Sequence, residues 1–318
     1  MRIAFFGTSV FAVPCLRALV EHGHVVSVVV TQPDRPAGRG GKLTPPPVKL
    51  LANELGLPVL QPESCRMPEF LTELRACAPE LNVVAAYGQF LPDPVRLLPR
   101  AGSVNLHGSL LPKYRGAAPI QRAIWQGETL TGVCLMWMVR AMDSGDVISC
   151  VEVPIHPDDT AGSLTATLAE QAAALLLHWL PAIENGTAPH IPQLHEAATL
   201  APLIRKEERD LDWRQPAIML ARQIRALFPN PSAVSTFRGA PVKILSAEPL
   251  PAIANTRAPG IIIPTEGNTD LWIVTGEGLL AIHTLHPAGK RAMSGAEFLR
   301  GYHVQPGEGM MTAGNSEQ

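Results

Sequence analysis

An asparagine and a histidine two positions apart, Asn105 and His107, end the short apolar segment at residues 103–106. Residues two apart on a strand point to the same side of a sheet, so both side chains are expected to share one face. Gly108 leaves backbone room beside the histidine. In open α/β sheets, ligands bind at the carboxyl ends of the strands. The pair is therefore predicted to face a ligand-binding rim.

A carboxylate that can orient this histidine is present in the segment RAMDSGD, where Asp143 and Asp146 follow a strand predicted at residues 131–139. Asp-Ser-Gly-Asp is also good turn chemistry, so these residues alone leave open which aspartate acts, or whether either does. An asparagine amide can donate to the oxyanion of a tetrahedral intermediate. A histidine held by a carboxylate can move protons. The set favours acyl transfer to an amine without a covalent intermediate.

The elements that must position these groups follow from hydrophobic spacing. Short apolar or β-branched runs alternate with helical stripes through the first half of the chain. Strands are predicted at residues 2–6, 25–31, 57–60, 81–87, 103–106, 131–139 and 147–153. Strands that alternate with helices predict a Rossmann-like, mostly parallel α/β sheet with helices on both faces.

The second half of the chain has a different texture. Residues 187–203 are rich in Pro, His and Ala and show no periodicity, which indicates a linker. A helical stripe over residues 216–228 precedes short alternating strands, which favour a small OB-like β-barrel. The predicted division is a catalytic domain (1–188), a linker (189–205), a C-terminal β-barrel domain (206–306) and a disordered tail (307–318).

Composition limits the class of protein. The 318 residues carry a net charge of −2, so a nucleic acid would have to be held by a local basic patch. The first ten residues read as a strand and not as a signal peptide, and no apolar run has the length of a membrane span. We therefore expect a cytoplasmic protein without a membrane partner. The five cysteines are odd in number and never spaced as CxxC, which argues against a disulfide framework and a zinc ribbon.

Several common ligand motifs are missing. Gly7 follows the first strand, but the other glycines of GxGxxG are absent, which disfavours a nicotinamide-dependent reductase. Gly41-Lys42 is part of a P-loop pattern, but Pro36 and Leu43 break it on both sides. The histidines give no convincing pair of metal ligands, so no metal is expected.

The segment NLHGSLLP at residues 105–112, with MDSGD at 142–146, resembles the core of the folate-dependent formyltransferases. The resemblance implies that Asn105, His107 and Asp143 are catalytic, and that Asp143 rather than Asp146 matches the family's aspartate. It also implies a folate site with two parts. These are the SLLP segment (Ser109, Leu110, Leu111 and Pro112) and a loop for the pterin ring (Tyr87, Gly88, Phe90 and Leu91).

The acceptor is indicated by two further segments. Residues 31–49 are a long predicted loop, basic after Asp34, and its PDRPAGRG resembles the insertion loop of the methionyl-tRNA formyltransferases. The resemblance continues through KEERDLDW (206–213) and PAGK (287–290), and Gly41 departs from it where many relatives carry lysine. It implies tRNA contacts from Arg35, Arg39, Lys42 and Lys206.

The reaction implied is transfer of the formyl group of 10-formyltetrahydrofolate to the α-amine of methionyl initiator tRNA, for translation initiation, by a monomer. One alternative is an N-formyltransferase for an amino sugar nucleotide, which shares the core but does not need the basic loop. Another is a non-catalytic tRNA- or folate-binding protein, which has no reason to keep all three catalytic residues. A stand-alone purine-pathway formyltransferase would leave the second domain unexplained.

Overall fold

The computed structural model describes residues 1–37, 41–251, 257–264 and 270–312, and its internal contacts divide the chain into two units. The first unit comprises Met1–Pro119, Leu130–Pro154 and Leu164–Pro202. The second comprises Ile120–Thr129, Ile155–Ser163 and Leu203 onward. Two short segments that interrupt the first unit in the sequence therefore belong to the second unit.

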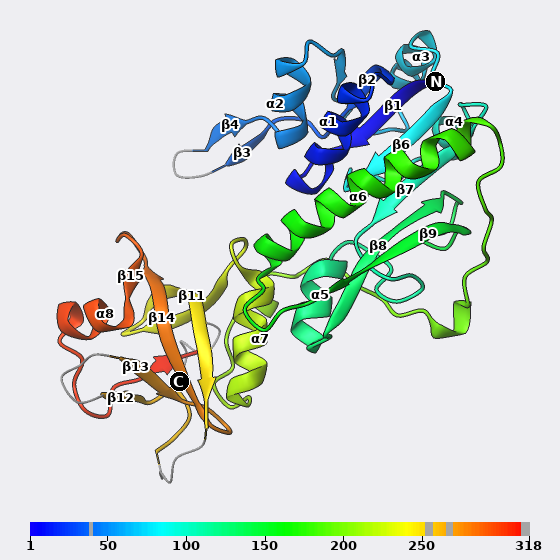
Figure 1. Ribbon diagram of the computed structural model, residues 1–318. Helices are drawn as coiled ribbons and strands as arrows, with labels where there is room; N and C mark the ends of the chain where they lie inside the picture. The colour runs from blue at the N-terminus through cyan, green and yellow to red at the C-terminus, as the bar shows by residue number, and fades with distance from the viewer. Residues whose placement is uncertain (38–40, 252–256, 265–269, 313–318) are drawn as a thin grey trace. The chain divides into compact units, whose positions relative to one another are not determined.

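The first unit is built on a seven-stranded sheet in the order β5-β2-β1-β6-β7-β8-β9. Its first five strands are parallel, whereas β8 and β9 run antiparallel to their neighbours. The predicted mostly parallel sheet is confirmed (Figure 1). The strands are β1 (Arg2–Gly7), β2 (Val25–Val30), β5 (Val59–Leu60), β6 (Leu81–Ala85), β7 (Ser103–His107), β8 (Leu130–Trp137) and β9 (Val147–Pro154).

Helices pack on both faces of this sheet. Alternate residues of β1 point to opposite faces, and both sets are buried. Ala4 and Phe6 share a core with Phe70 and Leu74 of α3. Residues from the opposite face are buried as well, and every residue from Ile3 to Phe6 is fully buried. The helical segments are η1 (Val10–Ala12), α1 (Val13–Glu21), α2 (Pro47–Glu54), α3 (Pro68–Ala76), α4 (Asp93–Arg96), α6 (Ala161–Glu184) and η2 (His195–Ala197).

A two-stranded hairpin occupies the long segment between β2 and α2. Its strands are β3 (Arg35–Ala37) and β4 (Lys42–Thr44), paired antiparallel. The segment was predicted as a loop, and the pairing of three residues per strand is too short to give a periodic signal in the sequence. None of the helices in the described ranges is both long and apolar enough to cross a membrane.

The second unit is an antiparallel sheet in the order β12-β13-β14-β11-β10-β16, with β15 paired to β14. Its core includes Trp213, Phe237 and Phe298. The predicted β-rich C-terminal domain is confirmed. Its elements are α5 (Pro119–Gln126), η3 (Glu207–Arg209), α7 (Ala217–Leu227), β10 (Ala233–Phe237), β11 (Ala240–Leu250), β12 (Ile262–Pro264), β13 (Leu271–Val274), β14 (Leu279–Pro287), β15 (Met293–Ser294), α8 (Gly295–Tyr302) and β16 (Met310–Met311).

The tail differs from its prediction over residues 307–312. Met310 and Met311 pair with β10, while Gly309 forms an isolated antiparallel bridge with Ile261, just before β12. The tail thus adds β16 to the sheet beside β10 and links it by one bridge to the residue before β12, which leaves fewer unpaired backbone groups. Glu308 also binds Arg238 through two hydrogen bonds of 2.7 Å. The rest of the tail, 313–318, lies outside the described residues.

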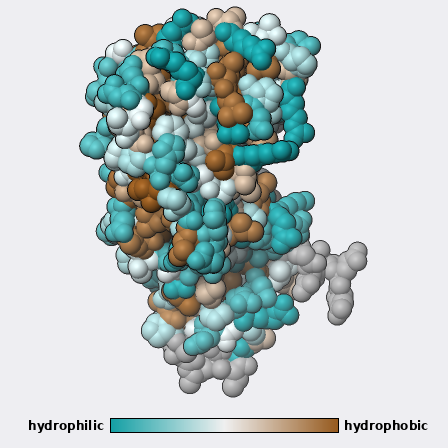
Figure 2. Space-filling model, turned by 90° about the vertical axis from the view of Figure 1, so that its right-hand side faces the viewer, coloured by the Kyte–Doolittle hydropathy of each residue, from teal (hydrophilic) through white to brown (hydrophobic). Residues whose placement is uncertain are grey.

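Exposed apolar side chains are scattered over the surface. On the face shown in Figure 2, hydrophobic patches are small and interrupted by hydrophilic residues wherever the described part of the chain is coloured. Single exposed apolar residues are normal in soluble folds and need no special account. One of them, Phe90, lies in the segment predicted to receive the pterin ring.

The number and spacing of the cysteines argued against a disulfide framework, but the structure contains one disulfide. Cys15 and Cys65 are buried and free, and Cys77 is free and partly exposed. Cys134 and Cys150, however, form a disulfide. They lie directly opposite each other on the antiparallel strands β8 and β9. Spacing along the chain could not show this pairing, because it depends on the register of two strands.

Thiol titration should therefore find three thiols in the unfolded chain without reductant and five after reduction. In the folded protein Cys77 should react first, because it is partly exposed whereas Cys15 and Cys65 are buried. Burial raises the pKa of all three thiols, that of Cys15 to about 12. Mass spectrometry of the alkylated protein gives both counts. Five thiols in a non-reduced, air-handled sample would contradict the disulfide.

Candidate active site

His107 ends β7 and its side chain is buried, with 5% of its surface exposed. Its Nε2 lies 2.9 Å from the backbone carbonyl oxygen of Tyr114. Because a carbonyl only accepts hydrogen bonds, Nε2 must carry a proton. The free ring atom Nδ1 lies 3.7 Å from Oδ2 of Asp143. Nδ1 is therefore the atom that can exchange a proton on the side of the carboxylate.

Asp143 reaches this histidine from the turn between β8 and β9. Its Oδ2 accepts a hydrogen bond of 2.9 Å from the backbone N–H of Gly116. Asp146 instead lies 3.5 Å from Nδ1 of His190. The structure thus separates the two aspartates that the residue pattern alone left open, and pairs Asp143 with His107.

Asn105 lies two residues before His107 on β7, between Val84 of β6 and Met136 of β8. Strand alternation places its side chain on the same side of the sheet as that of His107. The asparagine is partly exposed, whereas the histidine is buried. Its amide is therefore on the same side of the sheet as His107 and accessible from solvent.

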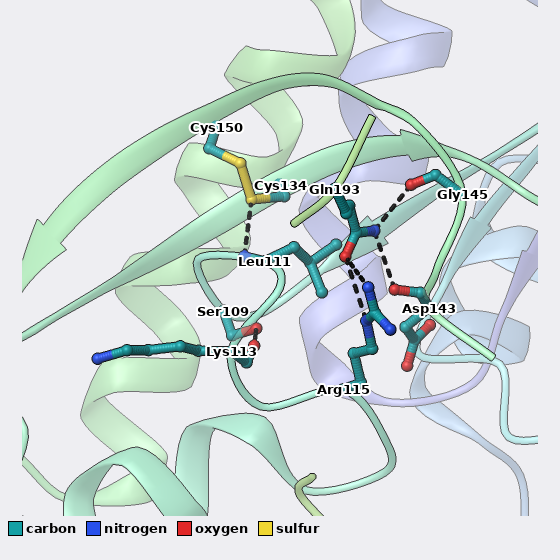
Figure 3. Close-up of a disulfide and its surroundings, with 9 residues drawn as sticks. All are labelled: Ser109, Leu111, Lys113, Arg115, Cys134, Asp143, Gly145, Cys150 and Gln193. Atoms are coloured by element: carbon teal, nitrogen blue, oxygen red, sulfur yellow. Dashed lines mark hydrogen bonds between the residues drawn. A yellow bond between two sulfur atoms is a disulfide. The ribbon is translucent and has the colours of Figure 1, made fainter. Parts of the chain in front are cut away.

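The turn after His107 presents a small apolar surface. Ser109 is fully buried and its hydroxyl donates to the Lys113 carbonyl at 2.7 Å, so this serine supports the turn from inside. The Leu111–Pro112 peptide bond is cis, and the Leu111 N–H lies 3.3 Å from Sγ of Cys134 (Figure 3). Leu110, Leu111 and Pro112 stay partly exposed. They are accessible to a ligand, and their role in a folate site stays a prediction.

The segment predicted to receive the pterin ring divides into two kinds of residue. Tyr87 and Leu91 are buried at 2% exposure each, and the Tyr87 ring packs edge-on against Phe6. The Tyr87 hydroxyl lies 3.1 Å from Sγ of Cys65, and burial raises the pKa of this tyrosine. Gly88 and Phe90 are exposed. Only these last two can touch a ligand directly, while Tyr87 and Leu91 support them.

The predicted tRNA-binding residues are on the surface where the structure describes them. Arg35 lies on β3 and forms an ion pair of 3.0 Å with Glu63. Lys42 lies on β4 and is exposed, as is Lys206 in the second unit. Arg39 lies outside the described residues.

The base of the hairpin is held by a polar cluster. Nζ of Lys49 donates to both carboxylate oxygens of Asp34, at 2.9 and 2.8 Å. Nε2 of Gln61 donates to Oδ1 of Asp34 at 2.8 Å. The hydrogen bond from Gln61, followed by that from Lys49, lowers the pKa of Asp34. Lys49 thus stabilises the base of the hairpin through Asp34, whereas Lys42 is exposed.

The segment predicted to be a linker contributes to the site. Tyr114 N–H donates to the Thr199 hydroxyl at 2.8 Å, and Arg115 exchanges backbone hydrogen bonds with Thr199 and Ala201 at 2.8 and 2.7 Å. Residues up to Pro202 belong to the first unit. The segment lacks periodicity because its backbone is mostly irregular. Its contacts with Tyr114 and Arg115 could not be predicted from the sequence.

Comparisons with known proteins decide the family. Residues 1–180 match the profile of the formyl transferases, and residues 203–303 match that of the formyl transferase C-terminal domain. The chain belongs to the formyl transferase family. The resemblance, the α/β-plus-barrel fold and the enzyme class predicted from the sequence are confirmed.

Relatives of this formyltransferase match it over nearly their whole length. The methionyl-tRNA formyltransferase of Moorella thermoacetica is 46% identical over 97% of this chain and 98% of that protein. That of Halalkalibacterium halodurans is 44% identical over 99% of both. The match therefore includes the basic hairpin and the barrel as well as the catalytic core.

Two solved structures share the fold at lower identity. HypX from Aquifex aeolicus in complex with tetrahydrofolic acid has a TM-score of 0.66 at 20% identity, covering 97% of this chain and 48% of HypX. The N-formyltransferase from Helicobacter canadensis, in complex with folinic acid and dTDP-3-aminofucose, has a TM-score of 0.64 at 18% identity, covering 90% and 98%. At such identities the likeness establishes the fold of this formyltransferase and no more.

The described residues hold no group of three or more His, Cys, Asp or Glu side chains placed to bind a metal ion.

Gly145 keeps the aspartate turn in place, and its replacement should lower activity. A Cβ atom at this position would overlap the backbone carbonyl oxygen of Trp137, and backbone cannot yield as a side chain can. We expect Gly145→Ala to displace Asp143 and to lower kcat by roughly 10- to 100-fold, the scale of a misplacement near 1 Å. Steady-state kinetics on the purified variant test this. Gly301→Ala, where a Cβ meets open space, should behave as wild type; an unchanged kcat in Gly145→Ala would contradict the argument.

Proposed function

We propose that this protein transfers the formyl group of 10-formyltetrahydrofolate to the α-amine of methionyl initiator tRNA in the cytoplasm, at the start of translation. The observation that carries the proposal is the His107–Asp143 pair, 3.7 Å apart at the rim of the sheet, in a chain that matches methionyl-tRNA formyltransferases over 97% of its length. We propose further that it acts as a monomer and without a metal.

The proposed donor site lies on the apolar surface beside His107. The folate would rest on Leu110, Leu111 and Pro112, with its pterin ring near Gly88 and Phe90. These residues are the exposed or partly exposed members of the two predicted folate segments. Flat aromatic ligands bind mostly through apolar contacts with a few polar groups that orient them, and this arrangement provides both.

In the proposed reaction the neutral amine of the methionyl group attacks the formyl carbon, and a new C–N bond forms. The Asn105 amide stabilises the oxyanion of the tetrahedral intermediate. His107 Nδ1 and Asp143 carry the proton lost by the attacking amine to N10 of the folate, as the bond between N10 and the formyl carbon breaks. Tetrahydrofolate leaves, and the protons on the protein are restored.

The experiment that tests the function is transfer of labelled formyl from 10-formyltetrahydrofolate to three acceptors in parallel. These are methionyl initiator tRNA, methionyl elongator tRNA and a dTDP-amino sugar. Selective labelling of the initiator tRNA supports the proposal. Labelling of the sugar alone would keep the catalytic assignment and overturn the acceptor, and no labelling of any acceptor would favour a binding protein.

The basic hairpin should contribute to tRNA binding through Lys42, which is exposed on β4. We expect Lys42→Ala to raise KM for methionyl initiator tRNA several-fold and to leave KM for the folate unchanged. Loss of one phosphate contact should reduce the slope of log K against log salt by about 0.7–0.9. Arg75→Ala, which removes one charge from an exposed position on α3, is the control. Equal effects of the two substitutions would refute a specific role for Lys42.

A further inference from the structure

A buried glutamine, Gln193, ties together the parts of the chain that carry the His107–Asp143 pair. It is only 8% exposed and lies in the segment predicted to be a linker. Its Oε1 accepts hydrogen bonds from Arg115 Nε at 3.1 Å and Nη2 at 2.6 Å. Its Nε2 donates to the backbone carbonyls of Asp143 at 3.0 Å and Gly145 at 2.7 Å (Figure 3). Both ends of the buried amide are therefore paired.

The arginine on one side of this amide sits between the two residues that contact the catalytic pair. Tyr114, just before Arg115, provides the carbonyl that accepts from His107 Nε2. Gly116, just after it, provides the N–H that donates to Asp143 Oδ2. A shift of the Arg115 backbone would therefore disturb both hydrogen bonds at once.

The aspartate on the other side of the amide needs outside support. Asp143 has a φ of 49°, in the left-handed region, and Tyr114 has a φ of 59°. Non-glycine residues hold such conformations only where the surroundings over-determine them. The Gln193 amide bonds the carbonyl of Asp143 itself and that of Gly145, on either side of Ser144. The amide thus fixes the turn from which the carboxylate projects.

We propose that Gln193, together with Arg115, is a positioning residue for the transfer reaction. It touches neither substrate nor the reacting atoms, and it acts by holding the Asp143 turn and residues 114–116 in one arrangement. In that arrangement His107 presents Nδ1 to the carboxylate while its Nε2 is held by a carbonyl. This inference rests on the proposed roles of His107 and Asp143.

Two substitutions distinguish the contribution of the Gln193 amide oxygen from that of its amide nitrogen. Gln193→Leu removes all four hydrogen bonds and leaves two buried carbonyls and the guanidinium without this partner. Gln193→Glu keeps the acceptors for Arg115 and loses the donors to the Asp143 turn. We expect kcat to fall about 30-fold in Gln193→Leu and less in Gln193→Glu, with KM for both substrates within twofold of wild type. If Gln193→Leu does not fold, Gln193→Glu alone carries the test, with an expected fall of at least fivefold.

The second unit offers a matched control. Gln223 is also buried, at 7% exposure, and its Nε2 likewise donates to two backbone carbonyls, those of Glu208 and Asp210, at 3.0 and 3.2 Å. Gln223→Leu should lower the melting temperature as Gln193→Leu does, but keep kcat within twofold. Comparable losses of kcat in both variants would mean that Gln193 is merely structural, and would overturn the proposal.

A double-mutant comparison tests whether Gln193 acts through the aspartate. Once Asp143→Asn has removed the carboxylate, Gln193→Leu should lower the remaining kcat less than threefold, because residues that act as a unit are not additive. An undiminished 30-fold loss in that background would overturn the inference.

A readout that needs no turnover separates this inference from the proposed function. In a ¹H–¹⁵N NMR spectrum of the imidazole groups, the Nε2–H of His107 should be protected from exchange in wild type and in Gln223→Leu, and lost in Gln193→Leu. That pattern with no formyl transfer to any acceptor would retain the positioning role and reject the function. If the wild type transfers formyl to initiator tRNA but Gln193→Leu leaves both the His107 signal and kcat unchanged, the proposed function is retained and the positioning role of Gln193 is rejected.

Discussion

His107→Ala and Asp143→Asn are each expected to lower kcat by about 10²- to 10⁴-fold, the usual contribution of a positioned proton-transfer group. The reason is that Nδ1 of His107 faces the Asp143 carboxylate at 3.7 Å while Nε2 is held by the Tyr114 carbonyl. Neither substitution removes the apolar surface of residues 110–112, so KM for the folate should stay within a few-fold. Single-turnover transfer with radiolabelled formyl measures the chemical step directly.

The chain contains its own control for this prediction. His190 and Asp146 form a second histidine–aspartate pair, at 3.5 Å, in which His190 stacks on Trp137 and is exposed. His190→Ala and Asp146→Asn should keep kcat within about threefold, because exposed pairs of this kind contribute little. If Asp146→Asn proved as damaging as Asp143→Asn, the choice between the two aspartates would be wrong.

The sequence was sufficient to predict those secondary-structure elements that have a local hydrophobic pattern. The β-branched run at residues 25–31 is β2, and the apolar segment at 103–106 is β7, because buried parallel strands need continuous apolar sequence. Strand alternation then placed Asn105 and His107 on one side of the sheet. The family resemblance added the choice of Asp143, which the turn chemistry of DSGD could not make.

Contacts between distant residues could not be predicted in this way. Arg115 and Gln193 are 78 positions apart, and a hydrogen-bonded amide in an extended segment leaves no periodic trace. The cysteine pair and the closing strand at Met310–Met311 depend in the same way on strand register. Such features are fixed by tertiary structure, and local propensity does not report them.

The resemblance indicated which segments form the predicted site, but not which of their side chains are exposed. It pointed to the loop after β6 as a ligand site, but Tyr87 of that loop packs in the core against Phe6. A motif states which residues occur together, whereas burial decides which of them can meet a ligand. Phe90→Ala is therefore the more direct test of the pterin site, and Tyr87→Phe reports mainly on its support.

The largest expected effect on stability concerns an ion pair inside the second unit. Both terminal guanidinium nitrogens of Arg122, on α5, donate to the Glu208 carboxylate, at 2.7 and 3.0 Å. The Arg205 N–H adds a hydrogen bond of 2.9 Å. These bonds, that of Arg122 above all, lower the pKa of Glu208 to about 2. Bidentate arginine–carboxylate pairs are among the stronger ionic contacts, and this one joins α5 to η3.

A depressed pKa in the folded state means that the unfolded chain binds the proton more readily, so stability falls as the pH is lowered. The contribution of Glu208 is complete above its unfolded pKa, near 4.5, and is lost between there and about pH 2. With 21% of the carboxylate side chain exposed, we expect about 2 kcal/mol, since solvent screens part of the shift.

Glu208→Gln should therefore unfold about 2 kcal/mol more easily than wild type at pH 7, and the difference should shrink steadily between pH 4.5 and pH 2. Urea denaturation at a series of pH values measures it. Glu54→Gln, which removes the more exposed partner of a 3.6 Å surface pair with Arg17, should change stability by less than about 1 kcal/mol at any pH. A Glu208→Gln deficit that stays constant down to pH 2 would show that packing, and not the charge of Glu208, stabilises this junction.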